Sequence, residues 1–216
     1  MKVALIGASG FVGSALLSEL QRRGHEITAI TRHPENVKSL PDVAAVKADV
    51  FNEDELANAL KGNDAIISAY NPGWTNPNIY EDFMKGARSI ENAAKKSGVS
   101  RIIIIGGAGS LEIAPGVQLV DTPQFPAEYK QGALGARDYL AHIRNEENLD
   151  WTFFSPAILM NPAITEGRTG RYRTGRDNPV FDEKGESRLS VEDLSVAIVD
   201  ALEKNTFIKQ RFTAAY

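Results

Sequence analysis

Cysteine is absent from the 216 residues of the chain. Disulfide bonds, thiolate nucleophiles and zinc sites built from thiolates are therefore excluded. Histidine is also scarce, and the spacing of His25, His33 and His142 is not that of metal ligands. The sequence therefore predicts no metal site.

Long apolar runs and dense basic blocks are missing too. The most basic stretch, 168–176, is interrupted by glycine and followed by Asp177 and Asp182, and the net charge is -4. Neither a nucleic-acid-binding face nor a membrane span is expected. The first residues read as a strand rather than a signal peptide, which predicts a cytoplasmic protein. We expect a small molecule as its partner, with the chain a monomer or homodimer.

Short apolar runs alternate with helical patterns along the chain. Apolar runs and turn residues predict strands at 3–6, 26–31, 43–47, 65–69, 101–105, 151–154 and 211–214. Helical spacing predicts helices at 11–23, 53–61, 78–96, 127–147 and 191–204, with irregular segments at 106–126 and 161–187. This alternation predicts an α/β fold with a doubly wound parallel sheet, the Rossmann fold, in three α-β-α layers. A single NAD(P)-binding domain would span 1–216, its C-terminal third (about 157–216) forming a small substrate-covering portion.

Glycines at positions 7, 10 and 13 lie between the first predicted strand and the first helix. Gly7 would permit a tight turn, Gly10 the close approach of a diphosphate, and Gly13 close packing of helix on strand. The amides of Gly10, Phe11 and Val12 would face the phosphates, with Ser9 in the same loop. An ordinary glycine-rich turn is the alternative. We interpret 7–13 as the binding loop for a nicotinamide dinucleotide.

The residue after the second predicted strand bears on which dinucleotide binds. An acidic residue there would favour NAD, but this chain has Arg32, which suits a 2′-phosphate. A solvated surface arginine is the alternative. We therefore expect the chain to bind NADP(H) in preference to NAD(H). Binding of NAD(H) is the alternative. Asp49 and Val50 follow the third strand, where Asp49 would either bind the adenine or begin a turn.

Five segments together resemble one family. GASGFVG, TRHP, ADVFN, IIIIGGAGSL and DWTFFSPA are similar to atypical short-chain dehydrogenases/reductases, in particular the NAD(P)H-binding, NADH-flavin reductase group near the biliverdin reductase B-like proteins. The resemblance implies a catalytic or nicotinamide-facing role for Ser110. It also implies that Ser155 and Pro156 edge the nicotinamide and that Ala69 and Tyr70 lie beside the cofactor ribose.

One departure from that superfamily concerns its acid catalyst, a tyrosine with a lysine four residues later. Tyr129 is followed by Ala133 and Tyr139 by Ile143, so neither has the lysine that lowers the phenol pKa. Tyr129 is a second catalytic candidate beside Ser110. Flavin reduction does not need this pair, because orienting two rings supplies most of the effect.

The sequence therefore predicts an NAD(P)H-dependent oxidoreductase that reduces a flavin or similar planar acceptor, the flavin being substrate rather than tightly bound cofactor. Tyr70, Trp74, Phe125 and Tyr129 would form an aromatic pocket for it or simply pack the loops. Arg168, Arg171 and Arg173 would bind an anionic substrate group or, as we favour, form a solvated hairpin. The alternatives are a non-catalytic NADP(H)-sensing regulator of the NmrA-like kind and, less favoured, a sugar-nucleotide epimerase or dehydratase.

Overall fold

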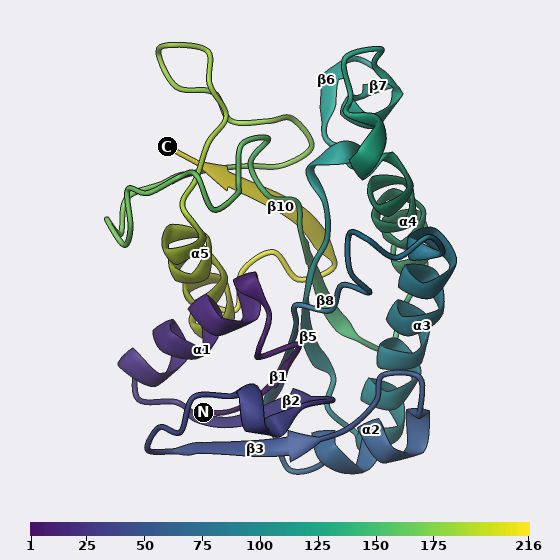
Figure 1. Ribbon diagram of the computed structural model, residues 1–216, viewed down its shortest axis with the longest axis vertical. Coiled ribbons are helices and arrows are strands. Elements are labelled where there is room, and N and C mark those ends of the chain that lie inside the picture. The colour runs from purple at the N-terminus through teal and green to yellow at the C-terminus, as the bar shows by residue number, and fades with distance from the viewer.

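An eight-stranded sheet forms the middle layer of the protein (Figure 1). The computed structural model describes residues 1–216. In spatial order the strands are β3 (Val43–Lys47), β2 (Glu26–Thr31), β1 (Lys2–Ile6), β4 (Ala65–Ser68), β5 (Arg101–Ile105), β8 (Asp150–Phe154), β10 (Gln210–Ala215) and β9 (Arg173–Gly175). All pair in parallel except β9, which lies antiparallel at the edge beside β10. The predicted doubly wound parallel sheet is confirmed.

Burial on both faces explains why the central strands are continuous apolar runs. Every residue of β5 is buried, and so are the last four residues of β1. Such strands carry no polar face, because helices cover the sheet on both sides. The run RIIII at β5 therefore contributes side chains to both hydrophobic cores.

Five helices form the outer layers (Figure 1). α1 (Phe11–Arg22) and α5 (Val191–Glu203) cover one face, and α2 (Glu53–Leu60), α3 (Ile79–Ser97) and α4 (Ala127–Ile143) cover the other. Gly98 ends α3 in the left-handed conformation, φ 80°. Ser190 caps α5 by accepting a hydrogen bond from the amide of Asp193. No helix of the chain is both long enough and apolar enough to span a membrane.

The connections contain more regular structure than the sequence predicts. The segment 106–126 forms the 3₁₀ turns η2 (Ala108–Ser110) and η3 (Leu119–Asp121) and a hairpin of β6 (Glu112–Ala114) and β7 (Val117–Gln118). Another 3₁₀ turn, η1 (Pro34–Asn36), follows β2. The expected end of α4 at 147 is wrong, because the helix ends at Ile143. Leu149 beyond it is 2% exposed, so the chain must turn early to bring that side chain into the core.

The strand order reverses between β1 and β4, which lie side by side but continue to opposite halves of the sheet. At such a point the connections leave the carboxyl edge in opposite directions and open a crevice there. The glycine loop (residues 7–13) follows β1, and Ala69 follows β4. The fold therefore brings the predicted loop to the edge where ligands bind in open α/β sheets.

Candidate functional site

Two of the three glycines in the glycine loop are required by contacts inside the chain. Gly7 has φ 79°, and a Cβ there would lie 2.7 Å from the carbonyl oxygen of Ala69. A Cβ on Gly13 would lie 2.0 Å from the carbonyl oxygen of Gly7. Both contacts are to backbone, which cannot move aside. Gly7 and Gly13 let β1, β4 and the first turn of α1 approach one another closely.

Gly10 has no such internal reason to be a glycine. Its backbone is extended, with φ -78° and ψ 174°, a conformation open to any residue. A Cβ there would meet only the Gly7 carbonyl oxygen, at an ordinary 3.4 Å. Apart from the two neighbouring residues, no other atom of the chain lies within 4 Å of that Cβ position.

The first turn of α1 carries amide groups without acceptors. The amides of Phe11, Val12 and Gly13 donate to no oxygen of the chain. The Gly10 amide, by contrast, donates to the Gly7 carbonyl at 3.0 Å. Of the three amides that the sequence predicts to face the phosphates, the Gly10 amide is used inside the loop. The amides of Phe11 and Val12 are free. Free amides at the positive end of a helix form an anion site.

The end of β2 lies against this loop. The Ser9 and Thr31 hydroxyls lie 3.1 Å apart and share a hydrogen bond. Arg32 follows immediately and is exposed, and its guanidinium makes neither a hydrogen bond nor an ion pair with the chain. The residue directly after the contact between β2 and the glycine loop thus carries an unpaired cation.

The residues after β3 have partly structural roles. One oxygen of the Asp49 carboxylate accepts a hydrogen bond from the Phe51 amide at 2.9 Å. Asp49 therefore begins a turn, which is one of the two roles that the sequence predicts for it. The Val50 carbonyl accepts one from the Ser89 hydroxyl at 2.5 Å. The second Asp49 oxygen has no partner in the chain, so the turn leaves one acceptor open at this edge of the sheet.

Tyr70, after β4, packs against α3. Its hydroxyl donates to the Asp82 carbonyl at 2.9 Å, and its ring fills the space that a Cβ on Gly86 would take, 2.4 Å away. Burial raises the pKa of the phenol, the Asp82 charge raises it further, and the Arg32 charge opposes this. Tyr70 is thus a neutral, packed side chain.

Ser110 is buried rather than open to a ligand. It is 1% exposed, and Arg211 donates to its carbonyl oxygen at 2.8 Å and to its hydroxyl at 3.0 Å. The Ser155 hydroxyl lies 3.4 Å from that of Ser110, and Pro156 beside it is buried. Arg211 also pairs with Asp177 through its Nε at 3.0 Å. In this conformation Ser110 belongs to a packed polar cluster, and its catalytic role stays a prediction.

Arg211 is the member of the Ser110 cluster that sequence reasoning missed. The available signal was a charged side chain within the strand predicted at 211–214, because an arginine buried in a sheet needs several acceptors.

The two predicted tyrosines occupy different environments. Tyr139 is 1% exposed, its hydroxyl contacts Glu91 at 3.3 Å, and burial raises its pKa well above the ordinary value. Tyr129 is 47% exposed, and its ring meets that of Trp74 edge to face at 5.2 Å. Only Tyr129 is placed to contact a ligand.

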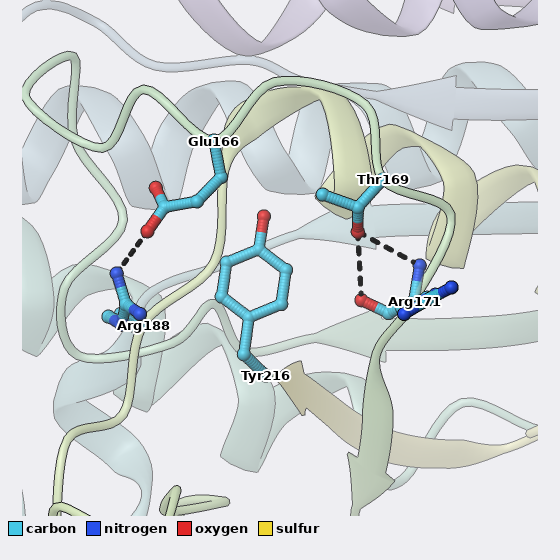
Figure 2. Close-up of a pocket in the computed structure, with 5 residues that line it drawn as sticks. All are labelled: Glu166, Thr169, Arg171, Arg188 and Tyr216. Carbon is cyan, nitrogen blue, oxygen red and sulfur yellow. Dashed lines mark hydrogen bonds and ion pairs between the residues drawn. The ribbon is translucent and has the colours of Figure 1, made fainter.

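A separate cavity of about 490 Å³ lies at the end of β10, and none of its lining residues belongs to the glycine loop (Figure 2). Figure 2 shows the Tyr216 ring between the Arg188–Glu166 ion pair and the Thr169–Arg171 turn. Arg171, which lines it, makes no ion pair. The neighbouring arginines are engaged: Arg168 donates twice to Glu19, at 2.7 and 2.9 Å, and Arg173 donates to main-chain carbonyls. Arg168 and Arg173 therefore stabilise the fold.

Comparison with known proteins agrees with this geometry. A family described as NAD(P)H-binding matches residues 7–204. A Bacteroides thetaiotaomicron structure provisionally named an epimerase is 45% identical, covering 100% of this chain and 96% of that one with a TM-score of 0.91. A Streptococcus pneumoniae structure provisionally named an NADH-flavin reductase is 35% identical, covering 100% and 99% with a TM-score of 0.85.

A third structure, from Burkholderia pseudomallei, is 44% identical, covers 100% of both chains and has a TM-score of 0.88. It is provisionally named an exported protein. The cytoplasmic location expected for the present chain therefore stays a prediction.

Proposed function

The chain belongs to the NAD(P)H-binding family, and we propose that it is a reductase that transfers hydride from NADPH to a flavin or a similar planar acceptor. Its relatives are oxidoreductase-like and epimerase-like proteins with the Rossmann fold. The provisional NADH-flavin reductase name of a full-length structural relative supports the choice of acceptor.

The observation that carries the proposal is the set of three free amides at the start of α1, on Phe11, Val12 and Gly13. Backbone amides left without acceptors favour an anion, and Gly10 leaves the space beside them that a diphosphate needs. The residues present therefore fit a dinucleotide. Gly7 and Gly13 would shape the loop, Ser9 would support it, and Phe11 and Val12 would bind the phosphates.

The remaining cofactor contacts follow the carboxyl edge of the sheet. Arg32 would pair with a 2′-phosphate, because its guanidinium has no competing partner. The free oxygen of Asp49, with Val50, would bind the adenine. Ala69 and Tyr70 would bound the ribose, and Ser155 and Pro156 the nicotinamide.

When bound, reduced nicotinamide supplies a hydride, that is one proton and two electrons, and the second proton of acceptor reduction comes from water. The protein holds the two rings together and limits solvent between them. A general acid is not needed. This accords with a chain in which Tyr139 is buried and Tyr129 lacks a lysine four residues later.

The test is NADPH oxidation, followed by its absorbance, with FMN, FAD, riboflavin and a set of quinones. Turnover above the non-enzymatic rate with at least one of them is expected, and NADH should be a poorer donor. Catalysis with none would refute the reductase. Tight NADPH binding that is sensitive to its redox state, with no turnover, would indicate the sensing regulator.

The epimerase name of the Bacteroides relative supports a second candidate. Such an enzyme would pass hydride from one carbon of a sugar nucleotide to NAD(P)⁺ and return it to the opposite face, so no solvent hydrogen would enter the product. Interconversion of two sugar-nucleotide epimers by catalytic amounts of protein with bound NAD(P)⁺, without net oxidation of NADPH, would favour it over the reductase.

A further inference from the structure

Trp74 and Tyr129 form an exposed aromatic pair at the edge of the sheet where the glycine loop lies. Trp74 is 54% exposed and Tyr129 47%, and their rings meet at 81°. The other tryptophan, Trp151, is 2% exposed. Neither the Trp74 Nε1 nor the Tyr129 hydroxyl has a hydrogen-bond partner in the chain. Two large rings thus face solvent with their polar groups unused.

The loop that carries Trp74 is held in place by its own hydrogen bonds. The Asn71 side chain accepts from the Gly73 amide at 2.7 Å, and the Asn76 side chain accepts from the Asn78 amide at 2.9 Å. Asn76 also donates to the Asp82 carboxylate at 2.8 Å. The loop therefore presents Trp74 in a defined position.

A glycine on α4 provides the seat for the indole. A Cβ on Gly132 would lie 2.7 Å from Cζ3 of Trp74 and 2.9 Å from Cδ1 of Ile79. A glycine inside a helix costs about 1 kcal/mol relative to alanine. Here its lack of a side chain lets the indole lie directly on the helix.

The same helix also contacts the loop after β5, where the resemblance places the nicotinamide. A Cβ on Gly109 would lie 2.8 Å from Cβ of Ala133, and one on Gly107 would lie 3.4 Å from Cβ of Ala136. Ala136 follows Gly132 by one helical turn, about 5.4 Å. The aromatic pair and the loop after β5 therefore rest on adjacent turns of α4.

We infer that the aromatic pair is the binding surface on which the planar ring of the acceptor stacks. The inference rests on the proposed function and specifies its substrate class: an uncharged heteroaromatic or quinone ring large enough to cover an indole. Offset and edge-to-face ring contacts favour such ligands, and the free phenol and indole N–H are available to their carbonyl groups. Tyr70 is not part of this surface, because it packs on α3, and Phe125 makes no ring contact with the pair.

The direct test measures binding of riboflavin by calorimetry in the presence of NADP⁺, which permits no turnover. Trp74→Ala should weaken riboflavin binding about tenfold, which corresponds to about 1.4 kcal/mol. Trp74→Phe should keep the affinity within about threefold, because a ring remains. Phe181→Ala is the matched control: it removes another exposed aromatic (45% exposed), and should leave the affinity unchanged.

Gly132→Ala separates binding from stability. The added methyl group displaces the indole from its seat, so riboflavin affinity should fall severalfold. The melting temperature should change by no more than a few degrees, because the preference of alanine for the helix offsets the shift of the Ile79 side chain, whose Cδ1 lies 2.9 Å from the added methyl group. A purely structural role for the aromatic pair would not give this combination.

The outcomes distinguish this inference from the proposed function. Wild-type protein that oxidises NADPH with a planar acceptor, together with a Trp74→Ala variant of unchanged riboflavin affinity, would overturn the aromatic surface alone. A loss of riboflavin affinity in Trp74→Ala no greater than that in Phe181→Ala would also overturn the aromatic surface. Wild-type protein that binds riboflavin on Trp74 but oxidises no NADPH would refute the reductase and leave the surface standing.

Discussion

The glycine loop and the C-terminal segment 161–216 differ in whether their polar groups have partners within the chain. In the glycine loop, three amides and the nearby Arg32 guanidinium have no partner. In the C-terminal segment, the buried Asp193 carboxylate accepts from the Thr169 amide and hydroxyl, the Gly170 amide and the Tyr216 hydroxyl. Unused donors leave room for a ligand to bind, whereas saturated acceptors mark contacts within the fold.

This difference separates two kinds of charged residue that look alike in sequence. Arg168 pairs with Glu19 and Arg211 with Asp177, while Arg32 pairs with nothing. Substitutions in the first group should change stability, and substitutions of Arg32 should change ligand affinity. The following experiments test that division, from the largest effect to the smallest.

Gly13→Ala should have the greatest effect. A Cβ 2.0 Å from the Gly7 carbonyl oxygen forces α1 away from β1. Overpacking against backbone should destabilise the protein by at least about 3 kcal/mol and abolish NADPH binding. Urea unfolding and calorimetry measure the two effects.

Gly10→Ala is the matched control, because its methyl group meets only one atom of the chain at 3.4 Å. It should unfold like wild type while losing NADPH affinity about tenfold or more. Wild-type affinity in Gly10→Ala would show that no ligand approaches the loop there.

Arg32→Glu should weaken NADPH binding about a hundredfold, because it removes a charged hydrogen bond and adds repulsion of the 2′-phosphate. NADH affinity should stay within about threefold of wild type. Calorimetry with both dinucleotides decides the matter, and equal losses would show that Arg32 does not select the cofactor.

Arg211→Met should act on stability instead. It leaves the carbonyl and hydroxyl of Ser110 without their donor, at a cost of about 2 kcal/mol. The free energy of unfolding should fall while the NADPH dissociation constant of the folded protein stays the same. A changed dissociation constant with intact stability would move this cluster into the binding site.

Glu19→Gln should have the smallest effect, and one that depends on pH. Burial raises the Glu19 pKa, but hydrogen bonds from Arg168 and Arg23 and their charges bring it below its ordinary 4.5. A carboxylate with a lowered pKa stabilises the fold above pH 4.5 and loses that contribution as pH falls below it.

The Glu19→Gln variant should therefore be less stable than wild type at pH 7, by about 1 kcal/mol. The difference in urea midpoint should shrink between pH 5 and pH 3, about the span in which a carboxyl group titrates. A difference that stays constant over that range would mean that the Glu19 charge contributes nothing.

Much of the fold could be predicted because the buried strands have an unmistakable composition. β2, β3 and β5 begin and end where the sequence predicts, and β1 differs by one residue. The β6–β7 hairpin and β9 could not be predicted, because strands of two or three residues are too short to show an alternating pattern. Neighbouring elements, not local pattern, stabilise them.

The candidate site divides in the same way. The spacing of Gly7, Gly10 and Gly13 predicted the loop, because a glycine-rich turn between a strand and a helix can be recognised from the sequence alone. The pairing of Ser110 with Arg211 joins residues 101 positions apart in sequence, and no spacing rule links them. The contact of Trp74 with Gly132 likewise depends on how α4 lies beside the loop after β4.

By itself, the sequence determined the parallel sheet and the glycine loop, because apolar runs and glycine act through the backbone nearest to them. Which polar side chains are saturated, and which stay free for a ligand, was decided only by the tertiary structure. The physical reason is that a hydrogen bond needs its two atoms within about 3 Å, and distant segments meet at that range only in the folded chain.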